Sequence, residues 1–134
     1  KLAHELCKRY DYIFIEDLNI EAMRRIWGKK ISDLCHSSFI DKLMYVSLKY
    51  GVIVHKIDKW YPSSKTCECG YINKLLSLKD RKWICPECES INDRDVLAAR
   101  NILRKGISEL ESKSNSSDSN IGVSCVCIQE SHLL

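Results

Sequence analysis

The chain has 134 residues, 45% of them hydrophobic, and its 21 Lys and Arg against 18 Asp and Glu leave a formal net charge of +3. This length allows one modest domain, or a small domain with an appendage. The apolar runs are only a few residues long, which excludes a membrane span, and the first residues lack the charged and apolar blocks of a secretory signal.

The chain opens with a predicted helix and a predicted strand. Residues 1–10 place apolar side chains at helical spacing on one face. Residues 12–15 (YIFI) form a continuous apolar run, which is typical of a strand buried on both faces of a parallel or mixed sheet. This strand ends abruptly at Glu16 and Asp17.

A second helix and a second strand follow. Residues 21–36 are mixed in character and indicate short helix and loop. Apolar residues then recur at helical spacing in a segment that Ser37 or Ser38 can cap at its N-terminus and that Gly51 can end. Residues 52–58 (VIVHKID) have the composition of a strand.

The second half contains an insert, a helix and a tail. Trp83 is expected in one arm of a hairpin within a cysteine-containing segment. The sequence NDRDVLAARNILRKGISEL predicts a helix capped by Asn92 or Asp93. Beyond about Glu111 the chain is rich in Ser and Asn, and we predict a disordered tail. Helix, strand, helix, strand, insert and helix together predict an α/β fold.

Two close pairs of cysteines stand out among the eight in the chain. Cys67 and Cys69 are separated by one residue, and Cys85 and Cys88 by two. Two such knuckles on facing hairpins can bring four thiolates to a tetrahedral Zn²⁺. The one-residue spacer alters the first knuckle, and Glu89 occupies the place of the usual glycine after the second. The alternative is four reduced cysteines without a metal.

The excess of basic residues is concentrated around these cysteines. Between His55 and Ile84 there are seven basic residues and three acidic ones. A local positive charge favours binding to nucleic acid, in which the phosphates supply most of the affinity. Trp60 and Trp83 are candidates for stacking on bases.

Two acidic residues are candidates for a second metal site. Glu16 lies at the carboxyl end of a predicted buried strand, where α/β folds build their sites; the alternative is a solvated acid. Asp95 precedes Ala98, Ala99 and Ile102 of its predicted helix by three, four and seven positions. This spacing places it on the inner, apolar face of the helix. The alternative is an acid favoured by the helix N-terminus. Together the two carboxylates would suit Mg²⁺.

The motifs IFIEDLNI, WYPSSKTCECGYIN, RKWICPEC and NDRDVLAARNIL, in this order, resemble the C-terminal half of OrfB/TnpB proteins of insertion sequences. These are often named transposases and look like ancestors of type V CRISPR effector nucleases. The resemblance covers roughly residues 1–106. It implies a partial RNase H-like (RuvC-type) domain with an inserted zinc ribbon, and RNA-guided cleavage of DNA in the cytoplasm of a prokaryote.

The resemblance also assigns roles to residues and segments. Glu16 matches the second catalytic acid of the family and Asp95 the third, both as ligands of Mg²⁺, and the four cysteines match the zinc ligands. DNA and, in the intact family member, a guide RNA are the implied partners. The segments are a partial nuclease core (1–60), the zinc-ribbon insert (61–91), the last RuvC-like helix (92–110) and a low-complexity tail (111–134).

The chain departs from the family pattern at several positions. The first catalytic Asp of the family falls upstream of Lys1, which also is not an initiator Met. Asn92 replaces the usual His, and Leu97 the usual Asn. We therefore expect a fragment of the endonuclease that is inactive alone. The alternatives are a zinc-ribbon module that binds nucleic acid without catalysis, or the product of a decayed gene.

Overall fold

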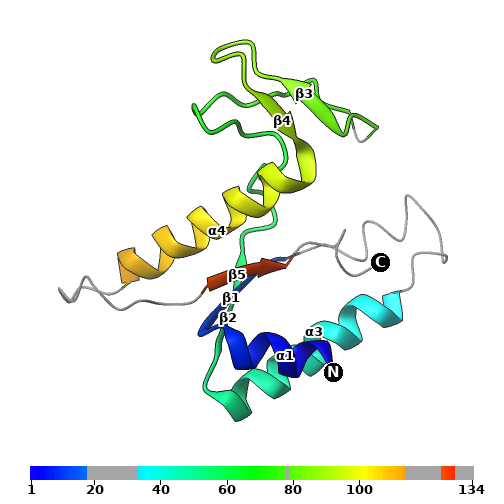
Figure 1. Cartoon of the computed structure of the whole chain (residues 1–134), viewed down its shortest axis with the longest axis vertical. Helices are drawn as coiled ribbons and strands as arrows, with labels where there is room; N and C mark the ends of the chain where they lie inside the picture. The colour runs from blue at the N-terminus through cyan, green and yellow to red at the C-terminus, as the bar shows by residue number, and fades with distance from the viewer. Residues whose placement is uncertain (18–32, 78, 114–124, 129–134) are drawn as a thin grey trace.

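The computed structural model describes residues 1–17, 33–77, 79–113 and 125–128 (Figure 1). For residues 33–37 and 125–128 the description is limited to the backbone. The helix and loop expected over residues 21–36 fall largely outside the described residues. In the described part of the chain, helices with the length and apolar character needed to cross a membrane are absent.

A three-stranded parallel sheet forms the centre of the molecule (Figure 1). Strand β1 (Tyr12–Glu16) lies in the middle, between β2 (Ile53–Ile57) and β5 (Cys125–Ile128). Both strands that the sequence predicted are confirmed, and so is the parallel arrangement that the apolar run of β1 indicated. Because the strands are parallel, the carboxyl ends of β1 and β2 lie at the same edge of the sheet.

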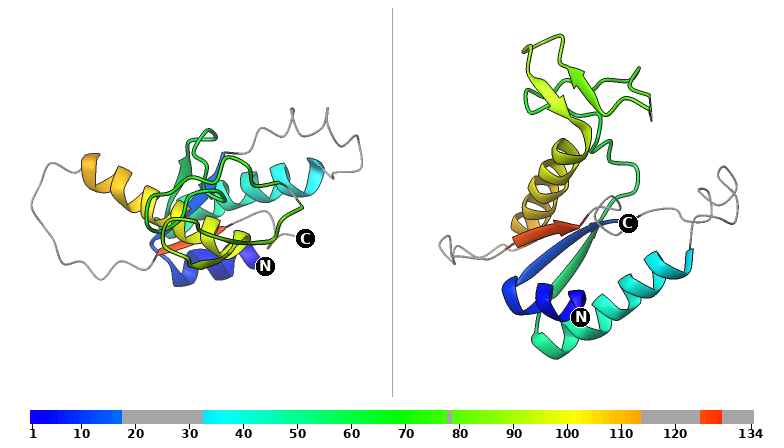
Figure 2. Two further views of the ribbon diagram at one scale, coloured as in Figure 1. Left: turned by 90° about the horizontal axis from the view of Figure 1, so that it is seen from above. Right: turned by 45° about the vertical axis from the view of Figure 1, so that its right-hand side comes forward.

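Helices cover both faces of this sheet (Figure 2). Helices α1 (Leu2–Arg9) and α3 (Asp33–Tyr50) lie on one face, and α4 (Arg94–Lys113) lies on the other. The predicted cap of α3 at Ser37 or Ser38 is wrong, because the helix begins at Asp33. The result is a three-layered α/β/α arrangement.

Alternate side chains of β1 supply two separate apolar cores. Ile13 and Ile15 are buried against α1 and α3. Phe14 points the other way and is buried with Ile57 of β2 and Ile102 of α4. Because the successive side chains of Ile13, Phe14 and Ile15 are all buried, β1 has the continuously apolar sequence YIFI.

The end of α3 follows the pattern that the sequence predicted. Gly51 has φ of +69°, in the left-handed region that glycine adopts without strain. The amide of Val52 donates to the carbonyl oxygen of Ser47 at 2.9 Å, as in a Schellman motif. This turn leads directly into β2.

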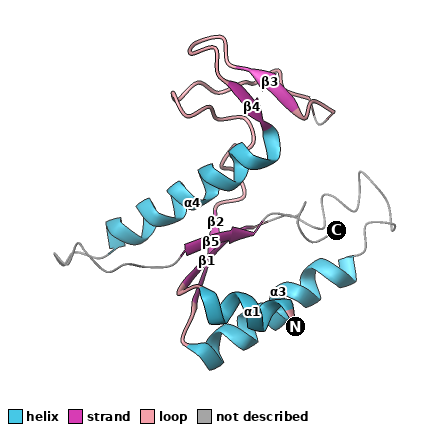
Figure 3. Ribbon diagram, viewed as in Figure 1, coloured by secondary structure: helices cyan, strands magenta, loops and turns pink. Residues whose placement is uncertain are grey.

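The cysteine insert, residues 61–91, stands at the N-terminal end of α4, away from the sheet (Figure 3). Its regular structure is the antiparallel pair of β3 (Lys82–Ile84) and β4 (Ile91–Asp93). Helix α4 begins immediately after β4, so one element joins the insert to the sheet. The hairpin arm predicted at Trp83 is confirmed.

The C-terminal segment differs from the expected disordered tail. Helix α4 continues to Lys113, beyond the predicted end at residue 110. Residues 125–128 form strand β5, which pairs with β1 in parallel. The expectation of disorder is therefore wrong for residues 111–113 and 125–128, and the rest of the tail lies outside the described residues. The short run CVCI acquires its role from pairing with a strand more than one hundred residues earlier, which the local composition does not encode.

Candidate metal centre and acidic residues

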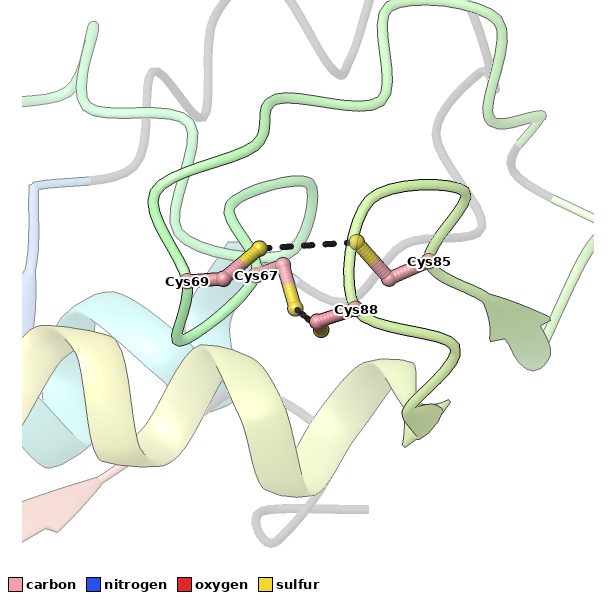
Figure 4. Close-up of side chains that lie close together, drawn as sticks. All are labelled: Cys67, Cys69, Cys85 and Cys88. Carbon is pink, nitrogen blue, oxygen red and sulfur yellow. Dashed lines mark hydrogen bonds between the residues drawn. The ribbon is translucent and has the colours of Figure 1, made fainter.

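The four predicted cysteines converge in the insert (Figure 4). The Sγ atoms of Cys67 and Cys88 are 3.6 Å apart, those of Cys69 and Cys85 are 3.5 Å apart, and all four lie within 4.8 Å of one another. Four thiolates bound tetrahedrally at about 2.3 Å would have sulfur atoms roughly 3.8 Å apart. The donor set and its spacing thus fit a metal ion.

The first knuckle is a tight turn around Cys67 and Cys69. The Cys67 amide donates to the Tyr71 carbonyl oxygen at 2.8 Å, and the Gly70 amide donates to the Cys67 carbonyl oxygen at 3.0 Å. Gly70 has φ of +96°, which a residue with a side chain rarely adopts. The glycine therefore permits the chain to reverse after the one-residue spacer.

The second knuckle has the same pattern of backbone hydrogen bonds, and one of its residues has a strained backbone conformation. The Cys85 amide donates to the Ser90 carbonyl oxygen at 3.0 Å, and the Glu89 amide donates to the Cys85 carbonyl oxygen at 2.9 Å. Glu89 has φ of +59° and is the one non-glycine residue with positive φ in the described ranges. It stands immediately after Cys88, as Gly70 stands after Cys69.

Two polar side chains from the second knuckle and β4 approach Cys67. The Ser90 hydroxyl lies 3.3 Å from the Cys67 Sγ atom, and the Asn92 amide nitrogen donates to it at 3.6 Å. Asn92 is buried, and it pairs with Trp83 across the hairpin. The sequence did not predict this role for Asn92, although its pairing with an apolar strand residue places it on the buried face.

These contacts change the ionisation of the cluster. Burial raises the pKa of the Cys67 thiol, but hydrogen bonds from Ser90, Asn92 and neighbouring groups outweigh it and lower the pKa to about 6. At Cys69 the hydrogen bond from the Tyr71 amide lowers the pKa, but desolvation and the neighbouring thiols raise it to about 12. The hydrogen bonds at Cys67 therefore favour its thiolate form, and a metal ion that binds all four cysteines must displace the remaining thiol protons.

The insert is anchored to α4 by an apolar cluster and by polar contacts. Leu97 is buried with Leu76, Trp83 and two of the cysteines. The Asn101 side-chain amide donates to the carbonyl oxygens of Ser63 and Thr66, both at 2.7 Å. These contacts hold the insert against the first three turns of the helix.

Glu68, the single residue between the first two cysteines, also faces α4. Its carboxylate accepts hydrogen bonds from Arg100 at 3.5 Å and Arg104 at 3.0 Å. Both arginines are largely exposed, so this charge pairing contributes little to stability. It orients the shortened knuckle toward the helix.

The two predicted catalytic acids lie on different elements. Glu16 is the last residue of β1 and is half-buried opposite Ile57. Asp95 lies in the first turn of α4, where its side chain is 45% exposed and pairs with Arg81 at 3.9 Å. Among the described residues, the four cysteines form the only group of three or more potential ligands, and Glu16 and Asp95 are not in such a group.

The two candidate stacking residues have opposite environments. Trp83 is only 7% exposed and belongs to the apolar cluster of the insert, so the prediction that it stacks on bases is wrong. Trp60 is 80% exposed in the turn that follows β2. Their local sequences do not distinguish them, because burial of Trp83 depends on packing against Leu97 of a later helix.

Comparison with known proteins agrees with the geometry of the insert. Residues 36–102, half of the chain, match the family model of the Cas12f1-like TNB domain. A Streptomyces pristinaespiralis protein named "Putative RNA-guided DNA endonuclease" is 37% identical over 110 residues, which are 80% of this chain and 27% of that protein.

Two further relatives extend this similarity. A TnpB-like protein of Acanthamoeba polyphaga mimivirus is 32% identical over 116 residues, with 80% of this chain and 22% of the relative aligned. The CRISPR-associated DNA-binding protein Cas12m of Allomeiothermus silvanus is 28% identical over 114 residues, which are 78% of this chain and 21% of that protein. The chain spans about a quarter of the length of the curated relatives that it matches. It belongs to the Cas12f1-like TNB domain family and is a TnpB-type protein.

Proposed function

We propose that this chain is the metal-stabilised, nucleic-acid-binding C-terminal part of an RNA-guided DNA endonuclease. The observation that supports it most directly is the convergence of the four cysteines in an insert that the family model matches. The parallel sheet, covered by helices on both faces, is consistent with part of an RNase H-like (RuvC-type) domain. Target DNA and a guide RNA are the proposed partners.

Zn²⁺ is the proposed ion at the four cysteines. Four thiolates are a ligand set typical of structural zinc sites, in which no coordination position remains for a substrate. The ion would link the two knuckles of an insert that has a short hairpin and a small apolar cluster. Its proposed role is therefore to stabilise the fold of the insert rather than to take part in chemistry.

Glu16 and Asp95 are the proposed carboxylate ligands of catalytic Mg²⁺. Such ions, when bound, would polarise a phosphodiester and activate a water molecule. Glu16 is held at the carboxyl edge of the sheet, and Asp95 at the start of α4. Two carboxylates are few for a site that holds two ions, so we expect that the isolated 134-residue polypeptide does not cut DNA.

A second candidate function is nucleic-acid binding without catalysis. The observation that favours it is the contact between Asp95 and Arg81, because an arginine beside the acid competes with a metal ion for its charge. In this alternative the insert and its basic surroundings bind DNA or RNA, and the two acids have no catalytic role.

The test of the proposed function measures metal and nucleic acid together. The purified chain should contain up to one Zn²⁺ and bind single-stranded DNA or RNA in a manner that weakens steeply with added salt. Cys85→Ser should lose both the zinc and the binding. Zinc content that is unchanged by this substitution would show that the assigned ligands are wrong.

Catalysis requires a separate experiment. The chain is incubated with Mg²⁺ or Mn²⁺ and single-stranded DNA, alone and fused to the upstream part of an intact relative. We expect cleavage only in the fusion and its loss in Glu16→Ala and Asp95→Ala. Activity of the fusion that survives both substitutions would contradict the assignment, and an inactive fusion that still binds DNA would favour the second candidate.

A further inference from the structure

The turn that follows β2 lies at the sheet edge that carries Glu16. Ile57, the last residue of β2, is opposite Glu16 in the register of the sheet. The Asp17 amide donates to the Ile57 carbonyl oxygen at 3.2 Å, so the two strands remain joined at this edge. Trp60 is three residues beyond Ile57 and is therefore close in the chain to the edge where the proposed catalytic acid lies.

The backbone around Trp60 is anchored although its side chain is exposed. The Trp60 amide donates to the Asp58 carboxylate at 2.9 Å, and the Tyr61 amide donates to the Asp58 carbonyl oxygen at 3.1 Å. Tyr61 packs against the core that contains Phe14. A turn held by these bonds limits the motion of the backbone that carries the indole, which lowers the entropy cost of binding a partner.

A basic group accompanies the exposed ring. The Lys59 ammonium nitrogen lies 5.3 Å from the centroid of the Trp60 ring. With 80% of Trp60 exposed, a planar partner has access to the ring. An indole face beside a positive charge matches a nucleotide, which offers an aromatic base and a phosphate at neighbouring positions.

We propose that Trp60 stacks on one base of a single-stranded nucleic acid while Lys59 contacts an adjoining phosphate, so that the strand is placed at the sheet edge of Glu16. This inference rests on the proposed function and names the form of its nucleic-acid partner. A single strand is required because each base in a duplex is covered on both faces by its neighbours, whereas an unstacked base leaves a face free for an aromatic side chain.

The experiment uses the full chain, loaded with zinc, and a fluorescently labelled single-stranded oligothymidylate. Fluorescence anisotropy measures the dissociation constant for the wild type, Trp60→Ala and Trp60→Phe. Because stacking on one base contributes about 1–3 kcal/mol, we expect Trp60→Ala to weaken binding roughly 5- to 150-fold. Trp60→Phe, which retains an aromatic face, should recover part of this loss.

Two controls separate stacking from other effects. Tyr45 of α3 is 75% exposed, and its helix covers a face of the sheet, so Tyr45→Ala removes an aromatic side chain elsewhere and should leave the affinity unchanged. An abasic strand of the same length keeps the phosphates and removes the bases. We expect the wild type to bind it as weakly as Trp60→Ala binds the oligothymidylate.

The contribution of Lys59 is measured from the salt dependence. Lys59→Ala should reduce the slope of log affinity against log salt by about 0.7, the value for one phosphate contact on a single strand. Equal binding of oligothymidylate by the wild type and Trp60→Ala, or equal binding of the abasic strand by the wild type, would overturn the inference and leave the proposed function standing. A wild type that binds no nucleic acid would overturn both.

Discussion

The residue after the second cysteine of each knuckle adopts a left-handed backbone conformation. In the first knuckle this residue is Gly70, and in the second it is Glu89. A side chain in that conformation costs about 1–2 kcal/mol, whereas glycine costs conformational entropy of about 0.5–1 kcal/mol. The difference favours glycine at position 89.

We therefore predict that Glu89→Gly raises the free energy of unfolding of the zinc-loaded chain by about 0.5–1 kcal/mol. The matched control is Glu87→Gly, which removes the same charge from the same knuckle at a position without positive φ. It should destabilise the chain by a similar amount. Urea titrations of the two variants measure the difference, and the same change in both would contradict the prediction.

The side chain of Asn92 contacts the sulfur cluster. Its side-chain amide donates to the Cys67 Sγ atom from a buried position. A donor beside a metal-bound thiolate disperses its negative charge and orients the ligand. An acceptor at this place would repel the thiolate instead.

Replacing Asn92 with Asp keeps the shape and removes the donor. We predict that Asn92→Asp weakens metal binding about 10- to 100-fold, the usual effect of losing an outer-shell partner. Asn73→Asp is the control: it adds the same charge to the insert, and Asn73 acts as an acceptor for the Leu75 amide, a role that Asp retains. Competition with a chromogenic zinc chelator gives the affinities, and equal losses in both variants would attribute the effect to charge alone.

At the scale of the elements, α4 is the helix that joins the insert to the sheet. Leu97 packs in the apolar cluster of the insert, and Ile102 packs against the sheet. The Asn101 side chain donates to the Ser63 carbonyl oxygen near the start of the insert. The Asp93 carboxylate caps the helix by accepting hydrogen bonds from the amides of Asp95 and Val96. Leu97 is thus an apolar contact of this junction.

The close approach of α4 to β1 depends on Gly106. A Cβ atom built at this position would lie 2.1 Å from the Cδ1 atom of Phe14, which is fully buried. We predict that Gly106→Ala destabilises the chain by about 1–3 kcal/mol through overpacking, although alanine favours a helix by about 1 kcal/mol.

Chemical denaturation of Gly106→Ala, with Ser108→Ala on an exposed position of the same helix as control, tests this contact. Ser108→Ala should be neutral or slightly stabilising, because the side chain is exposed and the substitution mainly raises the helix propensity. A Gly106→Ala variant as stable as the wild type would mean that Phe14 moves away at little cost.

At the scale of the whole molecule, the described side chains form three apolar clusters. Two lie on opposite faces of the sheet, and the third lies in the insert around Trp83. The third cluster is the one that includes two of the four cysteines. Its order should therefore depend on the metal more than that of the other two.

We predict that removal of zinc by a strong chelator unfolds the insert while the sheet stays folded. Hydrogen exchange of backbone amides in residues 82–93 should accelerate by at least tenfold on chelation, while residues 12–16 keep their protection. Restoring zinc should reverse the change. Loss of protection in both segments at the same chelator concentration would show one cooperative unit instead.

The sequence by itself determined the local elements and the grouping of the four cysteines. Apolar runs and helical periodicity predicted β1, β2, α1 and most of α4, because these patterns act over a few neighbouring residues. The spacing of the cysteines predicted a four-thiolate cluster for the same reason. The resemblance in its motifs identified the family, and the family model and the relatives support that identification.

Only the tertiary structure decided which of two similar residues does which task. Asp93 caps α4 and Asn92 turns toward Cys67, although both precede the helix. Trp83 is buried and Trp60 exposed. Strand β5 pairs with β1 from the far end of the chain. Each outcome depends on contacts between residues distant in sequence, which a local sequence pattern does not determine.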